Sequence, residues 1–230
     1  MNGRLLVTDL IRRGGIYGLT AEKFSLGRSN PDVVRAMLDA GVRIVQYREK
    51  TKKMGAKYEE CLLLRAMTRK AGAAFIVNDD IDLALLVDAD GVHVGQEDLP
   101  VAAVRSLVGD GRAIGLSTHS PDQARAAAAA GADYIGVGPI FATQTKDDVC
   151  APVGLSYLDF ALRETGLPCV AIGGIKGHNL AEVVRRGAGC VAMVTEIVGA
   201  TDIRTKVAEL DEVFRGCSDG TQAMPDRILS

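Results

Sequence analysis

A junction of small residues recurs four times along this chain, and it is the strongest constraint on the fold. In each copy a helical pattern ends at alanine, glycine or both, and an apolar strand begins at once. The copies lie at residues 40–42, 89–92, 130–133 and 186–189. A repeated junction of this kind is typical of an architecture built from one unit used several times, here a pair of strand–helix units.

Short apolar runs alternate with segments of helical periodicity between these junctions. Strands are expected at residues 16–20, 42–47, 73–77, 91–94, 113–116, 133–137, 168–172 and 190–194. The runs are apolar throughout, as in parallel strands that are covered by helices on both faces. Eight such units fit a compact TIM barrel. A doubly wound open sheet is the alternative, but no strand is followed by a Gly-x-Gly-x-x-Gly turn.

The fold class is therefore predicted to be α/β, with a single (β/α)8 TIM barrel over residues 16–215. Residues 1–15 are expected to form a short N-terminal extension, with a helix that ends at the glycine pair of residues 14 and 15. Residues 216–230 contain Asp, Gly, Ser and Pro, and are expected to form a flexible tail.

Charge and cysteine content exclude several classes of function. The formal net charge is -2, so a global basic surface for nucleic acid is not expected and any anion site must be local. The 5 cysteines are scattered, without a Cys-x-x-Cys pair, which argues against a disulfide framework and a zinc site. No stretch approaches the roughly 20 apolar residues of a membrane helix. We expect a reduced, cytoplasmic protein with no membrane partner.

Polar side chains follow the expected strands at the barrel end where TIM-barrel sites lie. After the second strand, Gln46, Arg48 and Lys50 alternate and so project from one face, with Tyr47 and Glu49 on the other. Two cations and an amide on one face suit a polyanion such as a diphosphate.

Two carboxylates from adjacent strands could share one metal ion. Asp79 follows the third strand and Asp98 the fourth. Mg²⁺ binds one or two carboxylates and completes its octahedron with phosphate oxygens and water. The neighbouring Asp80 is interpreted as the N-cap of the next helix.

A second anion site is predicted on the opposite side of the barrel. Gly173 and Gly174 follow the seventh strand, and Val194 and Thr195 end the eighth, where many barrels bind a phosphate through backbone N–H groups. We interpret this site as a neutral cup for a monophosphate. Two phosphorylated ligands over one barrel suggest group transfer with departure of diphosphate. The sequence shows no Ser-His-Asp arrangement and no His pair at metal-ligand spacing.

Six motifs together resemble thiamine phosphate synthase. They are QYREK at 46–50, VNDD at 77–80, DGVHVGQED at 90–98, GVGPIF at 136–141, TQTKD at 143–147 and IGGI at 172–175. The resemblance runs in family order over roughly residues 16–210. It implies a transferase that couples 4-amino-2-methyl-5-(diphosphooxymethyl)pyrimidine with 4-methyl-5-(2-phosphooxyethyl)thiazole, giving thiamine phosphate and diphosphate. It also implies a dissociative mechanism, in which diphosphate leaves before the thiazole nitrogen attacks.

The resemblance also implies a role for each site residue and one Mg²⁺ per site. The pyrimidine diphosphate would be held by Gln46, Tyr47, Arg48, Glu49, Lys50, Asn78, Ser117 and Lys146. Catalytic roles fall to Arg48, Ser117 and Lys146. The metal would be held by Asp79 and Asp98. The thiazole phosphate would be held by Thr143, Gln144, Thr145, Gly174, Val194 and Thr195. The partners are these two small molecules, with a homodimer expected by analogy.

Several positions depart from the family pattern, among them residues 150–152. Ala21 stands where the family has an acid after the first strand, and Glu196 puts a carboxylate near the proposed phosphate. Three other functions are alternatives. A thiazole tautomerase would not need the diphosphate-binding residues, and a sugar-phosphate epimerase would want paired acids and a His-rich metal site. The third is a non-catalytic barrel that senses thiamine precursors.

Overall fold

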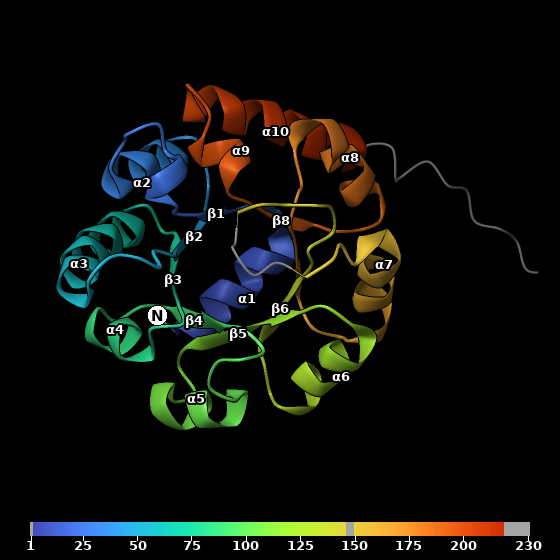
Figure 1. The fold of residues 1–230 in the computed structure, drawn as a ribbon, viewed down its shortest axis with the longest axis horizontal. Coiled ribbons are helices and arrows are strands. Elements are labelled where there is room, and N and C mark those ends of the chain that lie inside the picture. The colour runs from blue at the N-terminus through green and yellow to red at the C-terminus, as the bar shows by residue number, and fades with distance from the viewer. Residues whose placement is uncertain (1, 146–149, 219–230) are drawn as a thin grey trace, which may run out of the picture.

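The computed structural model describes residues 2–145 and 150–218, and its eight parallel strands close into one barrel (Figure 1). Each strand pairs with the next, and the first pairs with the last. The predicted TIM barrel is therefore confirmed. The strands are β1 (Gly15–Leu19), β2 (Ile44–Tyr47), β3 (Ala74–Asn78), β4 (Gly91–Val94), β5 (Ala113–Thr118), β6 (Tyr134–Val137), β7 (Cys169–Ile172) and β8 (Cys190–Met193).

Apart from the N-terminal helix, the helices form an outer ring around the strands (Figure 1). In chain order the helical elements are α1 (Gly3–Arg13), the 3-10 helix η1 (Glu22–Phe24), α2 (Asn30–Asp39), α3 (Met54–Lys70), α4 (Ile81–Leu86), α5 (Val101–Val108), α6 (Pro121–Ala129), α7 (Gly154–Glu164), α8 (Gly177–Arg185), α9 (Thr195–Val198) and α10 (Ile203–Ser218). Ser29 and Ser120 cap α2 and α6 by accepting backbone N–H bonds, and each is followed by a proline in the first turn.

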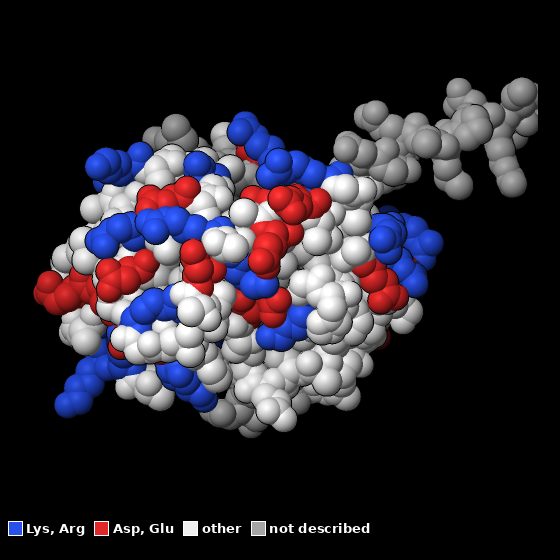
Figure 2. Space-filling model, turned by 90° about the horizontal axis from the view of Figure 1, so that it is seen from above, with Lys and Arg blue, Asp and Glu red and all other residues white. Residues whose placement is uncertain are grey.

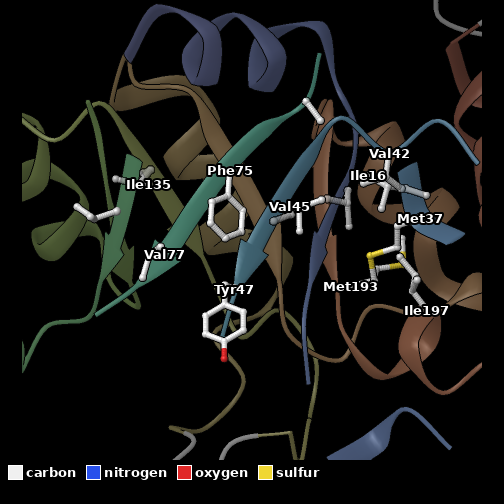
Figure 3. Close-up of a cluster of buried hydrophobic side chains, with 14 of the residues drawn as sticks. Ile16, Met37, Val42, Val45, Tyr47, Phe75, Val77, Ile135, Met193 and Ile197 are labelled. Carbon is white, nitrogen blue, oxygen red and sulfur yellow. The ribbon is translucent and has the colours of Figure 1, made fainter. Parts of the chain in front are cut away.

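The apolar core has an outer and an inner part. The outer cluster lies between the strands and the ring of helices and includes Val45, Phe75 and Ile135 (Figure 3). The inner cluster fills the barrel and includes Tyr17, Ile76 and other inward-facing residues of the strands. Both faces of each strand are therefore covered, which explains why the strands are continuous apolar runs.

Helix α1 closes the N-terminal end of the barrel. Its buried residues Val7 and Ile11 join the inner cluster, and the helix lies across the centre of the ring of strands in Figure 1. It ends at Gly14, whose φ of 84° is a left-handed conformation that favours glycine. The segment that the sequence suggested as an extension is thus part of the barrel's packing.

Two of the four recurring junctions tie an even-numbered strand to the strand before it. Asp90, at the start of β4, accepts the Phe75 N–H at 2.8 Å and is paired with Arg65 at 2.6 Å. Asp133, at the start of β6, accepts the Ile114 N–H at 2.7 Å. Both carboxylates are buried, so each is a satisfied charge that fixes the register of a strand pair.

The charged surface and the cysteines do not indicate a further functional site. The face in Figure 2 carries cations and anions side by side, without a stripe of one sign. All five cysteines are free. Within residues 2–145 and 150–218, no helix combines the length and the apolar character that a membrane span requires.

Candidate active site

A cavity of about 1290 Å³ opens at the carboxyl ends of the strands and collects most of the predicted site residues. Those that line it are Gln46, Arg48, Lys50, Asn78, Asp79, Asp98, Ser117, Thr143, Gln144, Thr145, Gly174, Val194 and Thr195. Lys146 lies outside the described residues. The residues come from all sides of the barrel, because its closure brings every strand end to one mouth.

The end of β2 is fixed by its neighbours on both sides. The Arg48 N–H donates to the buried Thr20 hydroxyl at 2.9 Å, which attaches this segment to the end of β1. The Gln46 amide donates to the Tyr17 hydroxyl at 2.8 Å inside the barrel. Lys50 reaches across to form an ion pair with Asp79. The cationic segment is therefore held in place before any ligand binds.

Tyr47 and Glu49 lie outside the cavity. The Tyr47 hydroxyl donates to the Glu60 carboxylate of α3 at 2.7 Å, and its ring belongs to the outer cluster (Figure 3). Burial raises the pKa of Tyr47, and the Glu60 carboxylate raises it further. Glu49 accepts from the Asn30 amide at 2.9 Å. Strand alternation, rather than membership of the motif, decides which of these side chains can reach a substrate.

Asp79 and Asp98 both face the cavity from neighbouring strands. Asp79 has a φ of 61°, a left-handed conformation that Asp tolerates better than most residues, and its N–H donates to the His93 carbonyl at 2.9 Å. Asp98 accepts the Gly95 N–H at 2.6 Å. Strained backbone at a cavity wall is typical of functional sites.

The donor set around these two acids fits a hard cation that is completed by a ligand. In the part of the chain that the structure describes, no three His, Cys, Asp or Glu side chains are grouped to hold a metal. Two carboxylates are nevertheless what Mg²⁺ commonly takes from a protein, with phosphate oxygens and water as its remaining ligands. The residues present therefore fit Mg²⁺ together with a phosphorylated substrate.

Asp80 does not cap α4 as the sequence suggested. It occupies the N-cap position, but its side chain makes no capping hydrogen bond. Its carboxylate is paired instead with Lys57 of α3 at 2.7 Å. Lys57 is buried, and a buried ammonium needs a counter-ion more than a helix end needs a cap.

The glycine turn after β7 lies directly against the loop after β6. Gly173 and Gly174 have φ values of 96° and 66°. A Cβ on Gly173 would lie 2.4 Å from the Cβ of Pro139, and one on Gly174 would lie 2.5 Å from the Ala142 carbonyl oxygen. Both glycines are therefore required, and the contact brings Gly174 close to the segment that carries Thr143.

Lys176 is a cation of the cavity that the sequence interpretation missed. It lines the cavity beside this turn, and its ammonium donates to the Thr195 hydroxyl at 2.8 Å. The phosphate cup that was predicted to be neutral therefore contains a positive charge. The available signal was a lysine two residues after the glycine pair, on a turn that was interpreted only through its backbone.

Glu196 is turned toward the start of α8. Its carboxylate accepts the Gly177 N–H at 3.0 Å and lies 3.5 Å from the Lys176 ammonium. Glu196 is not part of the cavity lining. The departure from the family pattern at this position therefore caps a helix and places no carboxylate in the cup.

Comparison with known proteins agrees with this geometry. The family model of thiamine monophosphate synthase matches residues 16–197. A thiamine-phosphate synthase of Pelotomaculum thermopropionicum is 66% identical over 86% of this chain and 91% of the relative. One of Caldicellulosiruptor bescii is 54% identical over 87% and 91%. The solved thiamine phosphate pyrophosphorylase of Pyrococcus furiosus is 32% identical, with a TM-score of 0.82 over 90% of this chain and 98% of that chain. The chain belongs to the thiamine monophosphate synthase family.

Proposed function

We propose that this protein is a thiamine-phosphate synthase, which joins the pyrimidine diphosphate to the thiazole phosphate and releases diphosphate. The observation that supports this most is that one cavity is lined by two separate groups of charged and polar residues, each suited to an anion. Arg48, Lys50 and two carboxylates lie on the β2–β4 side, and Lys176 with the Gly174 turn lies on the β7–β8 side. A tautomerase would have no use for the first site.

The β2–β4 side suits the diphosphate. Arg48 and Lys50 supply positive charge, and Asn78 supplies a neutral amide beside them. Asp79 and Asp98 would hold Mg²⁺, which when bound neutralises charge on a departing diphosphate. The ion pair between Lys50 and Asp79 places the lysine at this position. Lys146 is predicted to act on the same substrate.

The β6–β8 side suits the thiazole phosphate. The Thr143 and Thr145 hydroxyls lie 3.1 Å apart, and Thr195 holds the Lys176 ammonium at the other edge of the cup. A phosphate here would meet hydroxyl donors, the Gly174 backbone and one cation. These groups can fix the thiazole so that its ring nitrogen faces the pyrimidine.

The chemistry needs no nucleophile from the protein. The bond between the methylene carbon and the diphosphate oxygen breaks, and its electron pair leaves with the diphosphate. The aminopyrimidine ring is electron-rich and stabilises the resulting cation. The lone pair of the thiazole nitrogen then forms the new carbon–nitrogen bond. Cations and hydrogen-bond donors of the cavity act by stabilising charge on the leaving group.

The test is to incubate the purified protein with both substrates, in Mg²⁺ or in EDTA, and to measure both products by mass. Formation of thiamine phosphate and diphosphate in Mg²⁺ alone is the expected result. Binding of both substrates by calorimetry, without product in either condition, would overturn the proposal in favour of a sensor. Binding of thiazole phosphate alone would favour a tautomerase.

We expect Lys176→Gln to raise KM for the thiazole phosphate about 10- to 100-fold, since a hydrogen bond to a charged group contributes about 1.5–3 kcal/mol. The KM for the pyrimidine diphosphate should change little, because Lys176 lies on the other side of the cavity. Steady-state kinetics with each substrate varied in turn will measure both values. Lys206→Gln is the matched control, since Lys206 pairs with Glu209 on the surface of α10. An equal rise in both KM values would contradict the assignment.

Two further expectations stay predictions of the sequence. A homodimer is proposed by analogy, and a cytoplasmic location is proposed from the reduced cysteines.

A further inference from the structure

A chain of hydrogen bonds crosses the barrel along the wall of the cavity. The Gln46 amide donates to the Tyr17 hydroxyl at 2.8 Å, and the Tyr17 and Tyr134 hydroxyls lie 2.9 Å apart. The Tyr134 hydroxyl is 3.0 Å from Nδ1 of His93, whose Nε2 is 2.9 Å from the Ser117 hydroxyl. Five strands contribute one residue each, and all five residues line the cavity.

The barrel is shaped to hold this chain. Tyr17 and Tyr134 are 2% and 0% exposed, so neither hydroxyl can exchange its partner for bulk water. A Cβ on Gly115 would lie 2.1 Å from the Tyr134 ring and 2.5 Å from Nδ1 of His93. Glycine at this position of β5 is what admits both side chains. Burial also raises the pKa of both tyrosines, so they remain protonated donors.

The donor and the acceptor in each of these hydrogen bonds follow from which groups can only donate. The Gln46 amide nitrogen is only a donor, so the Tyr17 hydrogen is directed to Tyr134. The Tyr134 hydrogen then goes to Nδ1 of His93, which must accept it and carry no proton. The ring proton of His93 therefore resides on Nε2 and is donated to the Ser117 oxygen.

A doubly protonated His93 does not fit the same chain. Nδ1 would then donate to Tyr134, which already accepts from Tyr17. The Tyr134 hydrogen would have no acceptor along the chain, in the buried interior of the barrel. An unsatisfied buried donor costs about 1–3 kcal/mol. The network therefore favours the His93 tautomer that accepts at Nδ1 and donates from Nε2.

We propose that Tyr17, Tyr134 and His93 are positioning residues that commit the Ser117 hydroxyl to donate its hydrogen into the cavity. The Ser117 oxygen accepts a hydrogen bond from His93. The hydrogen of the Ser117 hydroxyl is therefore available to donate to a ligand. The acceptor is a phosphate oxygen or a nitrogen of a heteroaromatic ring. The identity of that ligand rests on the proposed function, whereas the direction of the chain does not.

The direction is tested on the free protein by nitrogen-15 NMR of the histidine rings. Nε2 of His93 should carry the ring proton and Nδ1 should act as the acceptor, and the signals are assigned by their loss in His93→Asn. His119 provides an internal reference for a protonated Nδ1, because its Nδ1 lies against the Gly138 carbonyl and must donate. A proton on Nδ1 of His93, alone or together with Nε2, would overturn the proposal.

The effect on Ser117 is tested by a double-mutant cycle in the coupling assay. Tyr134→Phe should lower kcat about tenfold in the wild-type background and leave it unchanged in Ser117→Ala, since the tyrosine acts through the serine. An equal loss in both backgrounds would mean a merely structural role and would overturn the proposal. Thermal unfolding of each variant confirms that it is folded. A wild-type protein without coupling activity would refute the proposed function, while the NMR result would still decide the direction of the chain.

Discussion

Asp79→Asn is expected to lower kcat about 10²- to 10³-fold, the loss typical when one group that stabilises charge in the transition state is removed. The asparagine keeps the size of the side chain and tolerates the φ of 61° at least as well as aspartate. It removes the anion that the proposal assigns to Mg²⁺ and that pairs with Lys50. Steady-state kinetics over a Mg²⁺ titration will measure the loss and should show a higher Mg²⁺ requirement.

Asp80→Asn is the matched control for this variant. It changes the same kind of side chain at the next residue, where the carboxylate is paired with Lys57 and does not line the cavity. We expect its kcat to stay within about threefold of the wild type. Unchanged activity in Asp79→Asn, or an equal loss in both variants, would contradict the metal assignment.

Asp133→Ala is expected to lower the free energy of unfolding by about 3 kcal/mol, the lower end of the range for breaking a buried ion pair. The Asp133 side chain is 2% exposed, and its carboxylate accepts the Ile114 N–H at 2.7 Å. It also pairs with Arg4 of α1 at 2.5 Å and with Arg105 of α5 at 2.6 Å. The lower end applies because both arginines can reach solvent. Denaturant unfolding will measure the change.

Asp122→Ala provides the comparison for stability. Asp122 also pairs with an arginine, Arg125, but its side chain is 95% exposed, and such a pair contributes about 0–1 kcal/mol. A similar loss in both variants would mean that the recurring acid has no special role in joining the strands.

The barrel itself could be predicted because its signals are local. Each strand is a continuous apolar run, and the repeated junction indicates pairs of strand–helix units. That α1 closes the N-terminal end of the barrel could not be predicted in the same way. Its apolar residues Val7 and Ile11 indicate a helix with one buried face, but only the closed barrel supplies the opening that this face fills.

The candidate site was predictable to the extent that strand geometry decides it. Alternation places Gln46, Arg48 and Lys50 in the cavity, and it equally removes Tyr47 and Glu49, which the family motif had included. Family pattern and geometry disagree there, and the contact of Tyr47 with α3 decides between them.

The roles of side chains whose partners are far away in the sequence could not be predicted from the sequence. Lys176 and Glu196 define each other's positions across two loops, so neither could be interpreted alone. Tyr134 lies within an expected apolar strand, and its hydrogen bonds could not be predicted because their partners lie on strands that are distant in sequence. Ala21, which replaces an acid of the family pattern, is buried in the outer cluster.

The most direct measurement is a crystal structure with diphosphate and Mn²⁺ in place of Mg²⁺, with the metal located by its anomalous scattering. We predict one metal bound to carboxylate oxygens of Asp79 and Asp98, with diphosphate oxygens completing its coordination and contacting Arg48 and Lys50. A metal bound elsewhere, or diphosphate seated at Lys176 and Gly174 without contact to these carboxylates, would contradict the assignment of the two anion sites.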